Sequence, residues 1–300
     1  MTHDPIRRRF LARAPALLAG VAATPFAVAP FAATTLATLL AAPGPARAAG
    51  SPLPLFDAHI HYSHDAVELL PPDQAVAMLR AAGLRGAFVS SSDDRGTQLL
   101  AAAAPDLIVP QLRPYRTRAD VGTWVREPAI VDYVEQRLAR HRYVGLGEFH
   151  LYGEEALLPV PRRLVALARE HGLILHAHSD TDAVERLFAQ WPDARVLWAH
   201  SGFERPEAVR AMLRRHPRLW CDLAFRGDHA DGDRIDPAWR EAFDEFSGRF
   251  VIGTDTFTPE RWHVIGDHAQ RSRRWLSALQ PAQAEAIGWR NAETLLRGAA

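Results

Sequence analysis

The chain has 300 residues, of which 48% are hydrophobic and 23% are charged, the composition of an ordinary globular protein. Its 35 basic and 35 acidic residues cancel, so no basic excess predicts binding to nucleic acid. The sequence contains no lysine, and its basic residues are all arginines. The single cysteine, Cys221, excludes an internal disulfide and a cysteine-based zinc site.

The first 48 residues have the pattern of an export signal. Arg7 and Arg8 begin a segment that resembles the twin-arginine motif, which the export machinery for folded proteins recognises. An alanine-rich run over residues 14–42 follows, and Ala46 and Ala48 form a small-x-small cleavage site. The alternative is a membrane anchor, which the prolines in the run disfavour, and no stable anchor is expected. We therefore predict a cleaved signal peptide, and a periplasmic or secreted protein.

Residues 49–300 remain after cleavage, and 252 residues are about the size of one (β/α)8 barrel. Short apolar segments alternate with helical patterns along this part of the chain. Strands are predicted over residues 55–62, 86–91, 107–112, 143–149, 173–178, 195–200, 219–225 and 250–255. Helices are predicted over residues 72–82, 98–104, 131–140, 161–171, 183–190, 206–216, 237–246, 261–279 and 282–296.

Eight apolar strands, each followed by a helix, favour a parallel sheet that is covered on both faces. Eight such units close into a single-domain α/β fold, a (β/α)8 barrel of the TIM type, here with an extra C-terminal helix. A doubly wound open sheet is the alternative, and the lack of a glycine-rich fingerprint before the first helix disfavours it. The polar stretch 226–236 is expected to be an enlarged loop that overhangs a site at the strand ends.

The first strand ends in a run that contains Asp57, His59 and His61. Because side chains on a strand alternate between its faces, His59 and His61 point the same way, about 7 Å apart along the chain. Two imidazoles in this arrangement can bind one metal ion. Asp57 is expected on the same face, one step deeper, where it would fix the tautomer of a histidine.

Other potential metal ligands end later strands. Glu148 ends the fourth strand, and a carboxylate there is costly to bury unless it binds a metal or pairs with a nearby arginine. His150 shares the face of Glu148. The fifth, sixth and eighth strands end in His176 with His178, in His200, and in Asp255. These residues converge only if the barrel closes, so the predicted barrel and the predicted metal centre support each other.

This order of residues resembles the amidohydrolase superfamily, and the resemblance covers essentially all of residues 49–300. The C-terminal segment 286–296 is similar to the ending of the amidohydrolase-related branch, which includes metal-dependent hydrolases, lactonases and aromatic-acid decarboxylases. Many members bridge two metal ions with a carboxylated lysine from the fourth strand. Since this chain has no lysine, Glu148 is the expected substitute.

The resemblance implies a role for each ligand. His59 and His61 would hold the more buried ion, and Asp255 would bind metal and move protons. His176 and His200 would serve a second ion, or one of them would be a polar catalytic group. His176 is preferred to His178 for this role because it directly ends the apolar run. The implied cofactor is one or two divalent ions, with zinc as the expected metal.

The expected mechanism follows from these ligands. A zinc-class ion lowers the pKa of a bound water to about 7. Asp255 would orient this water and transfer its proton, while His200 or the metal would polarise the bond to be broken. Residues expected to contact a small-molecule substrate are Arg113, Arg226, His150 and His178.

Three functions are consistent with the sequence. The favoured one is hydrolysis of an amide, ester, lactone or phosphoester. The first alternative is a single-metal lyase, such as a decarboxylase, with the same ligands. The second is an exported barrel that binds a metal or ligand without catalysis. The loops that determine the substrate do not reveal it, and the oligomeric state stays open.

Overall fold

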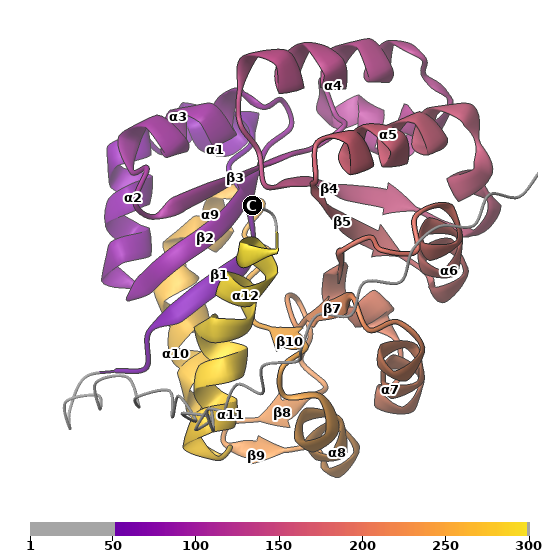
Figure 1. Ribbon diagram of the computed structural model, residues 1–300. Coiled ribbons are helices and arrows are strands. Elements are labelled where there is room, and N and C mark those ends of the chain that lie inside the picture. The colour runs from indigo at the N-terminus through magenta and orange to yellow at the C-terminus, as the bar shows by residue number, and fades with distance from the viewer. Residues whose placement is uncertain (1–51, 299–300) are drawn as a thin grey trace, which may run out of the picture. The chain divides into compact units, whose positions relative to one another are not determined.

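The computed structural model describes residues 52–298, and the predicted export signal lies outside them. Eight parallel strands form one sheet whose order follows the chain (Figure 1). They are β1 (Leu55–His61), β2 (Leu84–Ser90), β3 (Ile108–Leu112), β4 (Gly145–Leu151), β5 (Ile174–Ser179), β6 (Val196–Trp198), β7 (Leu219–Asp222) and β10 (Phe250–Val251). All eight predicted strands are present.

The sheet closes on itself between β1 and the segment that follows β10. The backbone N–H of Asp255 donates to the carbonyl of His59 over 2.8 Å, and the N–H of Ala58 donates to the carbonyl of Ile252 over 2.9 Å. The predicted (β/α)8 barrel is therefore confirmed, and the open sheet is excluded. Closure also brings the main chain of Asp255 directly beside that of His59.

Helices follow the strands, and several of them begin with proline, which suits the first turn because its missing N–H has no partner there. The helices are α1 (His64–Leu69), α2 (Pro72–Ala81), α3 (Arg95–Ala103), α4 (Ala129–Arg140), α5 (Pro159–Glu170), α6 (Thr181–Gln190), α7 (Pro206–Arg215), α8 (Pro237–Phe246), α9 (Pro259–His263), α10 (Ile265–Leu276), α11 (Pro281–Glu285) and α12 (Asn291–Arg297). Two predicted helices are each broken. The chain leaves helical geometry at Val264 between α9 and α10, and a π-helical turn, Ala286–Arg290, separates α11 from α12. No helix within residues 52–298 is long and apolar enough to cross a membrane.

The apolar core has two parts. The larger cluster fills the layer between strands and helices, to which α5 contributes Val160, Leu164 and Leu167 at helical spacing. The smaller cluster joins side chains of five strands to α12. Arg195, which precedes β6, donates to the carbonyl of Leu295 over 2.7 Å, so α12 lies at the amino ends of the strands. The carboxyl ends, where the predicted ligands lie, are at the opposite end of the barrel.

The stretch 226–236 differs from its prediction. It contains a short antiparallel hairpin, β8 (Ala230–Asp231) and β9 (Arg234–Ile235). None of residues 226–236 lines the cavity above the predicted ligands. Residues 203, 225 and 257, which are all phenylalanine, lie at that cavity instead.

Candidate metal centre

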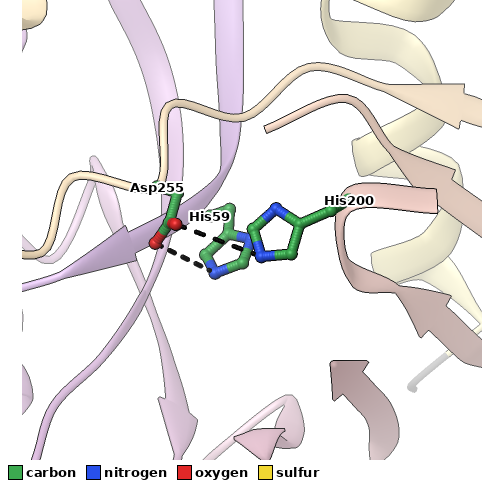
Figure 2. A group of neighbouring side chains, drawn as sticks. All are labelled: His59, His200 and Asp255. Carbon is green, nitrogen blue, oxygen red and sulfur yellow. Dashed lines mark ion pairs between the residues drawn. The ribbon is translucent and has the colours of Figure 1, made fainter. Parts of the chain in front are cut away.

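Four side chains from three parts of the barrel converge at the carboxyl ends of the strands. Nε2 of His59 lies 3.1 Å from Nε2 of His61 and 3.4 Å from Oε2 of Glu148. Nε2 of His61 also lies 3.1 Å from Oε2 of Glu148. Oδ1 of Asp255 is 3.5 Å from both Nε2 atoms. We call these four atoms site A. Figure 2 shows the carboxylate of Asp255 with one oxygen toward His59 and the other toward His200.

The tautomers of the two histidines leave lone pairs at the centre of site A. Nδ1 of His61 lies 3.1 Å from the carbonyl of Ser90, which can only accept a hydrogen bond, so this nitrogen carries the proton. Nδ1 of His59 lies 3.1 Å from Oδ2 of Asp222 and donates in the same way. In the neutral rings both Nε2 atoms are therefore acceptors, and they face two carboxylates. Only a cation or an added proton satisfies such a group.

The spacing of site A fits a small divalent metal. Ligands in a tetrahedron with bonds of about 2.0–2.1 Å lie roughly 3.3–3.4 Å from one another. Each Nε2 atom of site A lies 3.1 to 3.5 Å from the other Nε2 and from one oxygen each of Glu148 and Asp255. Imidazole nitrogens and carboxylate oxygens are also the ligands that zinc and similar metals use in catalytic sites. The residues present therefore fit the predicted cofactor.

The sequence did not identify Asp222, which is fully buried at the end of β7. Its Oδ2 contacts Nδ1 of His59 and lies 3.3 Å from Nε2 of His176, while Oδ1 accepts from the backbone N–H of His200 over 2.8 Å. Burial alone would raise the pKa of Asp222, but its histidine neighbours, His59 first, hold it below its usual range. An acidic residue that ends an apolar strand is the signal used for Glu148, and it would have found Asp222.

Asp57 does not have its predicted role. Its carboxylate accepts hydrogen bonds from the hydroxyl of Thr254 over 2.7 Å and from the backbone N–H groups of Thr254 and His59 over 3.0 Å. None of these hydrogen bonds goes to a histidine ring. Asp57 instead joins β1 to the segment after β10, and Asp222 fixes the tautomer of His59.

A second group of atoms lies on the other oxygen of Glu148. Oε1 is 2.8 Å from Nδ1 of His178 and 3.4 Å from Nε2 of His200. Nδ1 of His200 donates to the carbonyl of Ala224 over 2.8 Å, which leaves its Nε2 as a lone pair. We call these three atoms site B. Glu148 therefore faces both sites with its two oxygens, as a bridging ligand would need to do.

His176 belongs to neither site A nor site B. Its Nδ1 is 2.9 Å from Oε1 of Gln111, and its Nε2 faces Asp222. It does not line the cavity, whereas His178 does. His178 therefore contributes to site B, whereas His176 forms with His59 and Asp222 another group of atoms within 4.8 Å of one another that could hold a metal ion. The ring of His176 therefore links Gln111, at its Nδ1, to Asp222, at its Nε2.

His200 begins a strained turn that ends β6 early. Residues 200–203 all have left-handed backbone geometry, with φ between 51° and 63°. Such geometry is costly in non-glycine residues and is commonly found at functional sites. A Cβ at Gly202 would lie 2.2 Å from the ring of Trp198, so only glycine fits there. Asp222 helps to hold this turn by accepting from the N–H of His200 and from the hydroxyl of Ser201.

Arg226, predicted to bind substrate, supports the same turn instead. Its side chain is 4% exposed and donates to the carbonyls of His200 and Glu204 over 3.0 and 2.9 Å. It also pairs with Asp228 at 2.6 Å. Because its donors are already used and it does not line the cavity, Arg226 positions His200 and does not contact a ligand there.

Arg113 and His150 line the cavity as predicted. Arg113 donates to the carbonyl of Glu148 over 3.1 Å and to its Oε2 over 3.0 Å, so Glu148 has an arginine partner in addition to the histidines. His150 hydrogen-bonds to the hydroxyl of Tyr115 over 3.0 Å and stacks on His178 with ring centroids 4.3 Å apart. Burial lowers the pKa of His150 to about 4, so this ring is neutral near pH 7.

The cavity above the two sites has a volume of about 350 Å³ and an aromatic rim. Phe203, Phe225 and Phe257 are 53%, 54% and 42% exposed, and all three line the cavity. Phe203 stacks on His200 with a centroid distance of 4.7 Å. The guanidinium of Arg261 lies over Phe225 and donates to the carbonyl of Asp255, so one side chain holds both the rim and a site A ligand. This rim was not predicted from the sequence.

Comparison with known proteins agrees with this fold. The sequence model described as "Amidohydrolase" matches residues 6–298. The chain belongs to this amidohydrolase family. A search among curated protein sequences returned no match.

Solved structures are similar in fold at low identity. A probable 2-pyrone-4,6-dicarboxylic acid hydrolase from Acinetobacter baumannii matches with a TM-score of 0.54 and 11% identity, over 81% of this chain and 99% of that one. A β-aspartyl dipeptidase from Fervidobacterium islandicum matches with a TM-score of 0.53 and 15% identity, over 81% of this chain and 72% of that one. An uncharacterised TIM-barrel protein from Bordetella bronchiseptica matches with a TM-score of 0.53 and 15% identity, over 82% of this chain and 99% of that one.

Proposed function

We propose that this protein is a metal-dependent hydrolase that cleaves an amide, ester, lactone or phosphoester bond in a small molecule. The observation that carries the proposal is site A, in which two imidazole Nε2 atoms lie 3.1 Å from each other and 3.1 to 3.5 Å from oxygens of two carboxylates. Membership of the amidohydrolase family supports it. Two proteins of similar fold are named as hydrolases of a pyrone dicarboxylic acid and of a β-aspartyl dipeptide, which is consistent with this class.

A divalent ion at site A supplies Lewis acidity, polarising a substrate oxygen and lowering the pKa of water. Asp255 is the proton acceptor in this proposal. Its side chain is 13% exposed, more than those of the other site A ligands, and it faces the cavity. Asp255 would take a proton from the attacking water and deliver it to the leaving group. Nε2 of His200 lies 4.0 Å from Oδ2 of Asp255, and His200 would orient the scissile bond.

The aromatic rim indicates that part of the substrate is apolar. Exposed phenylalanines at a cavity mouth lose contact with water when a ligand covers them, which favours binding of an apolar group. Phe203, Phe225 and Phe257 come from the loops after β6, β7 and β10. We therefore propose a substrate whose reactive bond lies at site A and whose apolar part contacts this rim.

The experiment that tests the proposal is elemental analysis of bound metal in protein purified without chelators, followed by assays with lactones, esters and phosphoesters. We expect about two equivalents of metal per chain, and a fall toward one in Glu148→Gln, since Glu148 spans sites A and B. Glu154→Gln is the control, because Glu154 is 87% exposed and belongs to neither site. Protein that binds no added zinc would contradict the proposal, and release of carbon dioxide instead of a hydrolysis product would identify the lyase alternative.

We also propose that the protein is exported in its folded state by the twin-arginine route. The support is the sequence pattern at Arg7 and Arg8. The test is fractionation of cells that express the protein with a C-terminal tag. Replacing both arginines by lysine should leave the protein inside the cell at full length, whereas normal export of this variant would contradict the proposal.

A further inference from the structure

A second cavity lies behind the segment that carries Asp255. Its volume is about 320 Å³, close to that of the cavity above sites A and B. Thr254 lines the second cavity, whereas the next residue, Asp255, lines the first. The remaining walls come from the loop and hairpin after β7 and from α10. Two separate cavities therefore share one short segment as a wall.

The second cavity contains a buried histidine whose hydrogen bonding is incomplete. His229 is 7% exposed, and its Nδ1 has no hydrogen-bond partner within residues 52–298. Its ring meets that of Trp275 edge-on at 4.9 Å. Burial lowers the pKa of His229 to about 4, so the ring is neutral and offers one N–H donor and one acceptor. A buried polar atom without a partner is costly, and a bound ligand would remove that cost.

The same cavity has positive charge that nearby acids do not neutralise. Arg271 on α10 lines it, and no ion pair of Arg271 occurs in the described part of the chain. His268, on the same helix, lines it as a neutral ring that can donate a hydrogen bond, because burial lowers the pKa of His268. Asp231, which lines the cavity, and Asp228 in the same loop already have partners. Asp228 pairs with Arg226 at 2.6 Å, and Asp231 pairs with its hairpin neighbour Arg234 at 3.5 Å. Arg271 is therefore left to attract an anion.

The floor of the cavity is apolar, which limits the kind of anion. Leu223, Ile252 and Trp275 line it. Inorganic anions gain nothing from such a surface, whereas a carboxylate attached to a small hydrocarbon or aromatic body satisfies both parts. We propose that the second cavity binds a small organic carboxylate, with its apolar body on Trp275 and its charge facing Arg271 and His268.

Binding of benzoate to the whole protein, measured by ligand-observed NMR, tests this inference. The protein is first treated with chelator, so that metal at site A cannot bind the carboxylate. Benzyl alcohol is the uncharged comparison. We expect benzoate to saturate with a Kd of about 1–10 mM and benzyl alcohol to bind about tenfold more weakly. Equal binding of the two compounds, or no saturation by about 50 mM benzoate, would overturn the proposal.

Two arginine variants assign the binding to this cavity. Arg271→Gln should weaken benzoate binding about fivefold, because it removes a charge-assisted contact. Arg274→Gln is the matched control, since Arg274 is exposed on the same helix and does not line the cavity. Equal effects of both variants would show nonspecific attraction and refute the site. The test needs neither metal nor hydrolysis, so its outcome is independent of the proposed function.

Discussion

Nδ1 of His59 donates a hydrogen bond to Oδ2 of Asp222 over 3.1 Å, between two residues that are 163 positions apart in the chain. This contact determines which nitrogen of His59 faces site A. The other oxygen of Asp222 holds the backbone of His200. One buried carboxylate therefore orients a ligand of site A and a ligand of site B.

Replacing Asp222 by asparagine should weaken metal binding while the protein still folds. The amide keeps an acceptor for the N–H of His200, but it lacks the charge that favours donation by Nδ1 of His59. Loss of such a supporting contact typically lowers metal affinity about 10- to 100-fold. Zinc competition with a chromophoric chelator measures the change. Asp106→Asn is the control and should bind zinc as the unmodified protein does, because Asp106 is 65% exposed and pairs with Arg80.

Two histidines of β5 should differ in their effect on the second metal ion. His178→Ala removes the atom 2.8 Å from Oε1 of Glu148, so we expect loss of about one equivalent of metal per chain. His176→Ala removes only a contact to Asp222 and should retain both equivalents with a lower affinity. Metal analysis of both variants decides between them. A loss of stoichiometry in His176→Ala alone would restore the prediction made from the sequence.

Zinc uptake should release a proton and become weaker at low pH. Burial opposes protonation of His59, but three neighbouring carboxylates, with Glu148 first, raise the pKa of His59 well above its ordinary value. Burial lowers the pKa of His61 to about 4, so Nε2 of His61 carries no proton to release at neutral pH. Zinc must therefore displace one proton, and its affinity should rise about tenfold per pH unit between roughly pH 6 and 8. Calorimetry in buffers of different ionisation enthalpy counts this proton, and a pH-independent affinity would contradict the assignment.

The aromatic rim should affect substrate binding more than turnover. Phe225→Ala removes apolar surface that a bound ligand would cover, and a loss of about 1.4 kcal/mol corresponds to a tenfold increase in KM. We expect little change in kcat, since Phe225 is remote from the reacting bond. Leu157→Ala is the control, because Leu157 is 41% exposed and lies outside the cavity. An unchanged KM for substrates with a large apolar group would refute the role of the rim.

Much of the architecture could be predicted from local patterns. The eight strands and the helices after them follow from apolar runs, helical periodicity and prolines, which act over a few residues. The positions of His59, His61, Glu148, His200 and Asp255 at strand ends could be read from the same runs. Once the barrel closes, these ends meet in one volume, so the composition of site A was predictable.

The partners of each side chain depended on the tertiary structure. The carboxylate of Asp57 accepts a hydrogen bond from Thr254, which is 197 positions away in the chain, and no local pattern reports such a contact. His176 and His178 are equivalent in sequence, and the stagger of neighbouring strands decides which of them reaches Glu148. The contact between Asp222 and His59 forms only when β7 and β1 are both in the closed barrel. Local propensities determine the elements and the chemical types at their ends, whereas strand register and closure determine which atoms meet.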